Sequence, residues 1–554
     1  MPGEVRRRLL AVAVLLGALV HSPMPVATAQ EPVPRPSLVV PPAGLRGHAL
    51  WDSYYELAPL GYEEQELFVS GTARNAAGTA AAYTTRMIVT RPIDPTRFNG
   101  VVLLDWVNVT AQFENAVDTM LAREMLMREG FAYVHVSAQA AGLCCLPGLT
   151  PQMWDPVRYA ALDHPGDDWS FDMVTQIARA FEVPAPDGEI DPMGGVGVGA
   201  VRTVLAAGQS QSGIRLHDYV QEWLPTHPSA VGVIDGVLVH GDVDKDKAFG
   251  PSPPVPVLQL LSDYEAVDDG VDPATLHPNH RLWEVAGTSH ADLFIGYQSV
   301  FGHGPRVLAD APPVSGARFQ EIIDAAGNYG ERVDPLLATC VVAGAAMPMH
   351  YATSTAIHEL AAWVDGAPAP SSGPRFEFEG GELAKDGHGN TKGGIRLPPI
   401  DVPVARYEST LCQLGGITVP FLDPQLRALY PTHATYLGLM ADRSDAAVMA
   451  GWLLPEDATD LMRRACEARI RWLPPQAPCA PYEPPAFRSA AAPPAPDESA
   501  APPASPSPPA PGAPGSGRLP ATGSDGLAIP GALLLAAALL ARGPLRCAVP
   551  SRCC

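Results

Sequence analysis

Between roughly residues 39 and 473, short continuous apolar runs alternate with stretches in which apolar residues recur at helical spacing. Runs bounded by turn residues are typical of buried strands, and the longer periodic stretches are typical of amphipathic helices. The expected strands cover residues 66–72, 83–90, 100–107, 131–137, 202–208, 233–240, 255–261 and 281–286. The expected helices among them cover 114–129, 169–181 and 212–224. This alternation predicts an α/β fold, a mostly parallel sheet of about eight strands with helices on both faces.

The N-terminal 29 residues have the pattern of a secretory signal peptide. Three arginines at positions 6–8 precede an apolar run over 9–20, and positions 27–29 read Ala-Thr-Ala. The apolar run is shorter than the about 20 residues that a membrane-spanning helix needs. We therefore expect cleavage after Ala29, with a retained membrane anchor as the alternative.

The C-terminal end consists of two segments of unusual composition. Residues 474–518 are dominated by Pro, Ala and Ser, a composition that cannot bury enough apolar surface to fold and that stays extended. Residues 519–554 begin with Leu-Pro-Ala-Thr-Gly, continue with an apolar run over 527–541 and end in an arginine-containing tail. The expected organisation is a signal peptide over 1–29, a folded domain over 30–473, a linker over 474–518 and this final segment.

The final segment resembles the sorting signal of sortase-anchored Gram-positive surface proteins, in which an L-P-x-T-G pentapeptide precedes an apolar segment and a basic tail. All five positions match. The resemblance implies that sortase cuts between Thr522 and Gly523 and joins Thr522 to peptidoglycan. The apolar segment would lie in the membrane only transiently, with its arginines held inside. The expected location is extracellular and anchored to the cell wall; a single-pass membrane anchor is the alternative.

The formal charge of the chain is -22 at pH 7. Binding to nucleic acid needs clustered Lys and Arg against the phosphates, so this charge argues against a nucleic-acid partner. An excess of Asp and Glu is also what keeps an exported protein soluble. The acidity therefore carries no specific functional prediction.

Six cysteines precede the final segment, and outside the cell an even number can pair as disulfides. They are Cys144, Cys145, Cys340, Cys412, Cys466 and Cys479. Six cysteines allow 15 connectivities, which the sequence does not resolve, although Cys466 and Cys479 form a candidate local pair. No cysteine spacing matches a zinc site, and we expect neither a metal nor an organic cofactor.

The strand expected at 202–208 runs into Gly208-Gln209-Ser210-Gln211-Ser212-Gly213, just before a helix. A serine on a sharp strand-to-helix turn presents its Oγ above the sheet, the G-x-S-x-G arrangement of a nucleophilic serine. Such a turn needs small residues on both sides, and Ser212 stands where the pattern has its last glycine. Ser210 is therefore the candidate nucleophile.

A nucleophilic serine on such a sheet is followed in the chain by an acid and then by a histidine. The strand at 255–261 is followed by Asp263 and Glu265, so two carboxylates lie just beyond a strand's carboxyl end. Either could orient an imidazole. We prefer Glu265 because it lies further out on the loop, and Asp263 is the rival acid.

His290 lies on the loop that follows the strand at 281–286. In that position it would take the proton of Ser210 and return it to the leaving group, while the acid holds its tautomer. His350 is the rival base. A histidine in its position more commonly lines a pocket or packs at the start of a helix.

Two backbone N–H groups are needed to stabilise the negative charge that develops on a substrate oxygen. One is expected from Gln211, the residue after the nucleophile. The other is expected from the loop that follows the strand at 100–107, at Asn108 or Val109. This loop also matches a glycosylation sequon, which we discount for a bacterial wall protein.

With these residues in place, the chain resembles the alpha/beta hydrolase domain family of large serine hydrolases, in which G-x-S-Q-S-G is the usual form of the serine turn. The similar stretches are 105–109, 137–139, 208–213, 283–292, 363–366 and 389–398. The resemblance implies the α/β-hydrolase fold and a serine hydrolase. Two long insertions, at 142–166 and 294–347, are expected to act as lids over the substrate pocket.

The expected activity is hydrolysis of a small-molecule or lipid-like carboxylic ester through an acyl-enzyme. The preference for esters over peptides comes from the hydrolase class and from no residue of this chain. A peptidase or acyltransferase with the same three residues is one alternative. A non-catalytic surface binding protein on a hydrolase scaffold is another, although a binding scaffold needs none of the three.

Overall fold

The computed structural model describes residues 32–144, 146–242, 253–267, 270, 276–326, 344–412, 414–468 and 479–487. The expected signal peptide, most of the Pro-rich linker and the sorting signal with Thr522 and Gly523 lie outside the described residues. Among the described helices, none combines the length and apolar character needed to cross a membrane.

Nine strands form one sheet in the order β1-β2-β3-β5-β4-β6-β7-β8-β9. They are β1 (Ser37–Val39), β2 (Tyr62–Arg74), β3 (Ala80–Pro92), β4 (Val101–Trp106), β5 (Ala132–Val136), β6 (Thr203–Gln209), β7 (Gly236–His240), β8 (Val257–Ser262) and β9 (His280–Val285). Strands β5, β4 and β6 to β9 are parallel, whereas β1, β2 and β3 are antiparallel to their neighbours. The mostly parallel sheet is thus confirmed, with one strand more than expected because β1 is a three-residue edge strand.

Each central strand is buried on both faces, which explains its continuous apolar run. Successive side chains of β4 point to opposite faces. Val101 and Leu103 belong to the larger apolar core, together with helices α2 (Val117–Arg128) and α9 (Met349–Val364). Val102, Leu104 and Trp106 belong to a second core, which includes α4 (Ser170–Arg179) and the helix that follows β6. Helices therefore cover both faces, as the sequence predicted.

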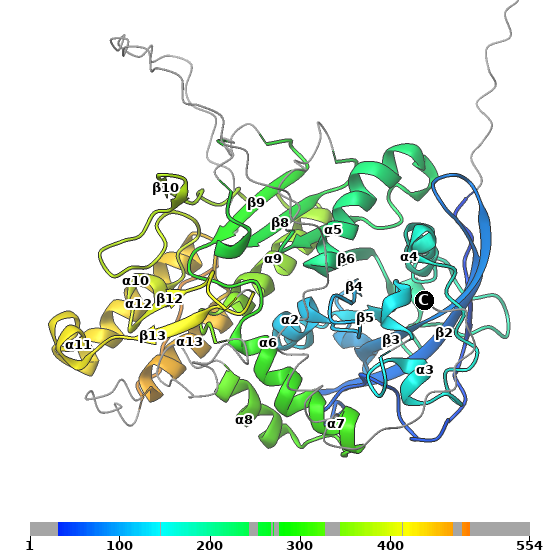
Figure 1. Cartoon of the computed structure of the whole chain (residues 1–554), viewed down its shortest axis with the longest axis horizontal. Helices are drawn as coiled ribbons and strands as arrows, with labels where there is room; N and C mark the ends of the chain where they lie inside the picture. Colours follow the sequence, from blue (N-terminus) through cyan, green and yellow to red (C-terminus); the bar gives the residue numbers. More distant parts are fainter. Residues whose placement is uncertain are drawn as a thin grey trace, which may run out of the picture.

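The further helices include the one after β6, which packs against the central strands β6 and β7 (Figure 1). They are α3 (Pro151–Trp154), α5 (Gln211–Asp218), α6 (Leu293–Tyr297), α7 (Gly304–Ala309), α8 (Gly316–Ala326), α10 (Pro398–Asp401), α11 (Asp423–Leu429), α12 (His433–Met449) and α13 (Pro455–Glu467). Two short ladders, β10 (Phe378–Glu379) with β11 (Glu382–Leu383) and β12 (Ala405–Glu408) with β13 (Ile417–Pro420), complete the fold. The helix expected over 212–224 is divided, because α5 gives way to a π-helical turn at Tyr219–Trp223.

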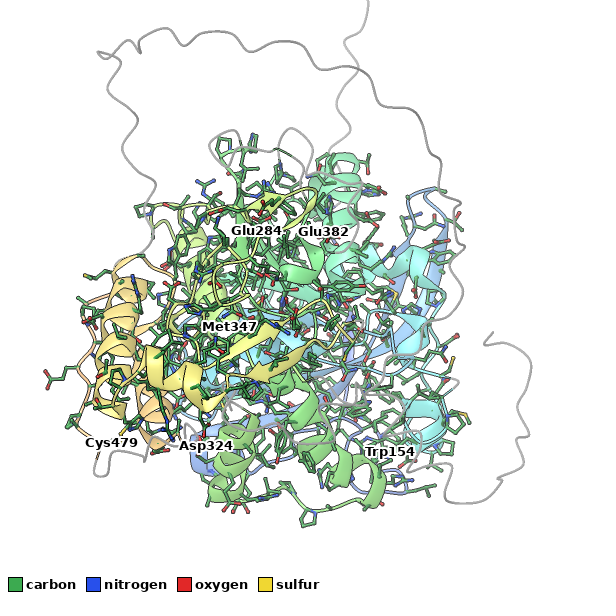
Figure 2. All side chains as sticks on the ribbon, turned by 60° about the vertical axis from the view of Figure 1, so that its left-hand side comes forward. Trp154, Glu284, Asp324, Met347, Glu382 and Cys479 are labelled. Atoms are coloured by element: carbon green, nitrogen blue, oxygen red, sulfur yellow. A yellow bond between two sulfur atoms is a disulfide. The ribbon has the colours of Figure 1, made fainter. Side chains whose placement is uncertain are left out.

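The two expected insertions pack against each other. Trp154 of α3 donates its indole N–H to the carbonyl of Val307 in α7 (3.0 Å), and both residues belong to a small apolar cluster. On the opposite side of the molecule, Cys479 forms a disulfide with Cys466 of α13, the local pair that the sequence suggested (Figure 2). Cys412 is also disulfide-bonded.

Candidate active site

The turn between β6 and α5 holds Ser210 in a backbone conformation that L-residues rarely adopt, with φ 62° and ψ −123°. Its N–H donates to the carbonyl of His240 at the end of β7 (2.8 Å). The turn is tight on both sides. A Cβ on Gly208 would lie 2.9 Å from the carbonyl oxygen of Ser212, and one on Gly213 would lie 2.5 Å from that of His240. Small residues are thus required where the motif has them, and strain of this kind is typical of functional sites.

The structure brings Ser210, His290 and Glu265 into one hydrogen-bonded chain. The Nε2 atom of His290 lies 2.7 Å from the Oγ of Ser210, and its Nδ1 contacts Oε1 of Glu265. All three side chains are buried, and the serine is 9% exposed. They follow β6, β9 and β8, whose carboxyl ends meet at one edge because these strands are parallel. Residues 80 positions apart are therefore neighbours here.

Glu265 is locked in place by its own turn. It is the last residue of a 3-10 turn (Asp263–Glu265) that begins at β8, and its Oε2 accepts the N–H (2.7 Å) and the hydroxyl (2.6 Å) of Ser262. Burial by itself would raise the pKa of Glu265. The contact with His290 and the hydrogen bonds from Ser262 outweigh burial and lower the pKa. The carboxylate thus stays ionised beside the imidazole.

Asp263, the rival acid, does not contact His290. Its Oδ2 accepts the hydroxyls of Thr391 and Ser409, both at 2.5 Å, and its Oδ1 accepts the N–H of Gly287 (3.0 Å). Burial raises the pKa of Asp263, although the positive charge of nearby Lys385 acts to lower it. Through Gly287, this carboxyl holds the start of the loop that carries His290.

The backbone N–H groups expected to form the oxyanion hole differ in whether they already make a hydrogen bond within the protein. The N–H of Asn108 donates to the carbonyl of Asn115 (2.8 Å), so the prediction that it faces the substrate is wrong. Asn108 and Asn115 form a bridge that closes the loop between them. Within the described part of the chain, the N–H groups of Val109 and Gln211 make no hydrogen bond, and Gln211 begins α5 beside Ser210.

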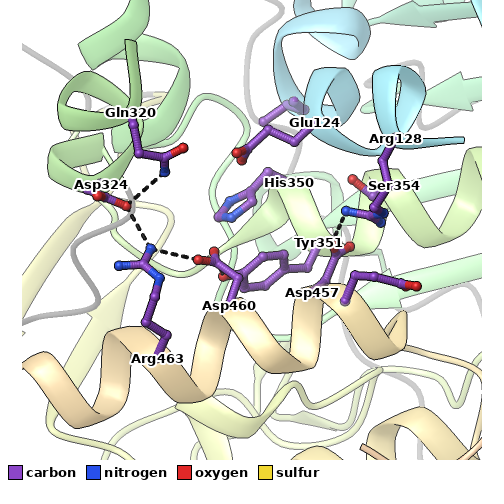
Figure 3. A pocket seen from close by; sticks show the side chains of 12 residues that line it. Glu124, Arg128, Gln320, Asp324, His350, Tyr351, Ser354, Asp457, Asp460 and Arg463 are labelled. Atoms are coloured by element: carbon purple, nitrogen blue, oxygen red, sulfur yellow. Dashed lines mark hydrogen bonds and ion pairs between the residues drawn. The ribbon is translucent and has the colours of Figure 1, made fainter. Parts of the chain in front are cut away.

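His350, the rival base, lies elsewhere. It is at the start of α9, where its ring stacks on Phe294 with 4.0 Å between centroids. It lines a separate pocket of about 400 Å³ together with Glu124, Tyr351 and Asp460 (Figure 3). Burial lowers the pKa of His350 to about 3. Neither Ser210 nor His290 lines this pocket, so the structure does not bring His350 to the serine.

Two side-chain contacts near the serine were not predicted from the sequence. Gln209, inside the motif, donates from Nε2 to the carbonyl of His290 (2.9 Å) and so ties the histidine loop to the serine turn. The side chain of Asn108 donates from Nδ2 to the carbonyl of Gln209 (3.0 Å), while its Oδ1 accepts the N–H of Thr110 (2.9 Å). Gln209 lies in the stretch 208–213 that resembles the family, and from the sequence Asn108 was considered only for its backbone N–H.

No group of three or more His, Cys, Asp or Glu side chains among the described residues could hold a metal ion. The hydrogen-bonded chain at the site offers the chemistry of a hydroxyl, an imidazole and a carboxylate.

Comparison with known proteins agrees with the fold. A family model described as alpha/beta hydrolase domain matches residues 23–463, most of the chain. The chain belongs to the alpha/beta hydrolase domain family. This alpha/beta hydrolase has the fold predicted from its sequence, a mostly parallel sheet covered by helices. Its N-terminal match begins ahead of the described residues.

Solved structures of hydrolases are distantly similar to this alpha/beta hydrolase. A serine hydrolase without lid from Xanthomonas campestris shares 15% identity over 44% of this chain and 97% of its own (TM-score 0.24). The esterase Est22 shares 12% over 49% and 83% (TM-score 0.26). A prolyl endopeptidase shares 12% over 41% of this chain, which spans 35% of that enzyme (TM-score 0.23). No curated protein sequence matches the chain.

Proposed function

We propose that this alpha/beta hydrolase is a serine hydrolase that cleaves carboxylic esters through an acyl-enzyme. The observation that carries the proposal is the chain from Ser210 Oγ to His290 Nε2 (2.7 Å) and from His290 Nδ1 to Glu265. A binding scaffold has no need of a strained serine hydrogen-bonded to a buried histidine and carboxylate.

Ser210 Oγ attacks the ester carbonyl carbon, and its proton moves to Nε2 of His290. Glu265 accepts the hydrogen bond of Nδ1–H throughout, so it selects the tautomer whose Nε2 is free and stabilises the imidazolium that forms. The imidazolium then gives its proton to the alkoxide that leaves, and the acyl group stays on Oγ. Water, deprotonated by the same histidine, hydrolyses the acyl-enzyme and restores the serine.

The tetrahedral intermediate carries a negative charge on the former carbonyl oxygen. We assign the N–H of Gln211 to this oxygen because it follows the nucleophile and begins α5. The N–H of Val109 is the second donor. The side chain of Asn108 holds the loop of Val109 against the serine turn through the carbonyl of Gln209.

The test compares two serine variants two positions apart with a series of p-nitrophenyl esters. Ser210→Ala should abolish hydrolysis, whereas Ser212→Ala should retain it because the Ser212 hydroxyl is buried without a hydrogen bond in the described structure. Chromogenic peptide amides and added alcohols, run in parallel, separate ester hydrolysis from peptidase and acyl-transfer activity. Equal loss in both variants, or unchanged hydrolysis in Ser210→Ala, would contradict the proposal.

We also propose that the enzyme is secreted and linked to the cell wall through Thr522. The support lies in the order of the signal-peptide pattern, Pro-rich linker, pentapeptide, apolar run and basic tail. Expressed in a Gram-positive host, the full chain should be released by muralytic enzymes and not by detergent. Thr522→Ala should shift it to the detergent-soluble membrane fraction or the medium, and an unchanged distribution would contradict wall linkage.

A further inference from the structure

Arg123 of α2 carries a buried positive charge whose described contacts are all with neutral groups. The residue is 5% exposed. Its Nη1 donates to Oε1 of Gln298 (2.9 Å) and to the hydroxyl of Tyr54 (3.3 Å), and its guanidinium lies over the rings of Tyr54 and Tyr55. Among the described residues no carboxylate pairs with it, and Nε and Nη2 make no hydrogen bond. A buried charge without a counter-ion is costly, so the site favours an anion.

A cavity lies next to this guanidinium. Arg123 and His303 line it together with Val107 and Asn115, which flank the loop of Asn108 and Val109. Its free volume is about 30 Å³, and about 10–15 Å³ suffices for one water-sized occupant. The cavity therefore accommodates a small ion, and it is too small for sulfate or for the acyl chain of a substrate.

His303 supplies a second donor. Its Nδ1 is buried and has no hydrogen-bond partner in the described structure. Its ring packs edge-on against Tyr54, with 4.8 Å between centroids. Burial first, and then the charge of Arg123, lowers the pKa of His303 well below its usual value. The ring is therefore neutral, and in the tautomer protonated at Nδ1 it donates to whatever fills the cavity.

The other charges around the cavity cancel. Arg86 also lines it, but both Glu66 and Glu114 bind this arginine, and Arg158 binds Glu66 from the other side. These two arginines balance the two glutamates and leave the charge of Arg123 in excess. Glu114 also lines the cavity, and its Oε1 makes no hydrogen bond in the described structure; this oxygen lies 3.3 Å from where a Cβ on Gly142 would be.

We propose that this cavity binds one small monovalent anion, chloride, between the guanidinium of Arg123 and Nδ1–H of His303. The site goes beyond the proposed esterase activity and involves none of its three residues. Val107 and Asn115 line the cavity and also flank the loop that contains Val109. An anion bound in the cavity therefore stabilises that loop. Chloride binding should thus raise the stability of the folded enzyme in a saturable way.

The solution test measures the melting temperature of the protein as the chloride concentration is raised at constant ionic strength. The protein is expressed as residues 30–487, without the expected signal peptide and sorting signal. Sulfate replaces chloride in the reference buffer. The melting temperature should rise and saturate with chloride. Arg123→Gln and His303→Phe should each raise the half-saturating chloride concentration about tenfold or more, since each removes a hydrogen bond to a charged group.

Arg128→Gln is the matched control because it makes the same change on the same helix outside this cavity. It should respond to chloride like the wild type. A chloride response that is absent, or that Arg123→Gln and His303→Phe leave unchanged, overturns the proposal.

Bromide soaked into wild-type crystals gives a direct answer even where Arg123→Gln does not fold. An anomalous peak is expected within hydrogen-bond distance of an Arg123 nitrogen and of His303 Nδ1. Density that fits only water, with no anomalous peak, overturns the proposal.

Discussion

Replacing Glu265 with Gln tests the role of the carboxylate at constant shape. Oε1 of Glu265 faces Nδ1 of His290, and Oε2 accepts the N–H and the hydroxyl of Ser262. A carboxylate accepts on both sides, but an amide has one acceptor and one donor. If the amide oxygen of Gln faces His290, its NH₂ meets the backbone N–H of Ser262, which can only donate.

That orientation leaves a buried donor unsatisfied, at a cost of about 1–3 kcal/mol. The amide therefore turns its NH₂ toward Nδ1 of His290. The imidazole must then carry its proton on Nε2, where it donates to Ser210 and cannot accept the serine proton. The same tautomer error in serine proteases costs about 10⁴ in kcat. We expect a loss of about 10³–10⁴ in kcat with an unchanged fold.

Asp263→Asn is the matched comparison. Two of the three hydrogen-bond partners of Asp263 are the hydroxyls of Thr391 and Ser409, which can rotate to accept from an amide. The amide oxygen then keeps the N–H of Gly287. We expect less than about a tenfold change in kcat, since each partner stays satisfied.

The assay measures kcat and KM for p-nitrophenyl esters in both variants, with circular dichroism as the check of folding. The reasoning is refuted if Glu265→Gln keeps more than a tenth of the wild-type kcat, or if Asp263→Asn loses as much as Glu265→Gln does.

Three further changes probe the surroundings of the site. Asn108→Ala should lower kcat about tenfold to a hundredfold with little change in KM. This loss is smaller than the about 10²–10³ in kcat that removal of an oxyanion donor itself costs. A change confined to KM would argue against a role of Asn108 in positioning the loop. Burial raises the pKa of Asp292 to about 7, so this group makes the free energy of unfolding fall as pH rises from about 4 to about 7. In urea denaturation, the free energy of unfolding of Asp292→Asn should fall less over that pH range than that of the wild type. An identical pH dependence in the variant and the wild type would contradict this role of Asp292. Arg86→Met removes the cation that pairs with the buried carboxylates of Glu66 and Glu114. The variant should lose about 3–5 kcal/mol in free energy of unfolding, measured in urea. A loss below about 1 kcal/mol would show that these glutamates are protonated or hydrated.

The central strands were predictable because burial on both faces gives each a continuous apolar run. The sequence placed β4 and β9 to within a residue or so. The antiparallel edge was harder. Strands β2 and β3 extend beyond their predicted bounds because their outer ends are partly exposed and carry polar residues, and the three residues of β1 are too few for a pattern.

For the site, chain order and position after a strand were enough to select Ser210 and His290 as candidates. They favoured Glu265 over Asp263 only through its position further out on the loop. That choice depends on which way each side chain leaves the turn after β8, and the turn is set by Ser262. The N–H of Asn108 was misassigned because it pairs with Asn115 across a loop. The pattern of apolar residues in the sequence does not reveal this pairing.

The most direct test of the central claim is mass spectrometry of the enzyme after treatment with a fluorophosphonate, which captures an activated serine. The intact protein should gain the mass of one phosphonyl group, and fragmentation should place that group on Ser210. His290→Ala should slow the labelling strongly. A folded enzyme that gains no such mass, or that carries the group on Ser212 or elsewhere, would contradict a nucleophilic role for Ser210.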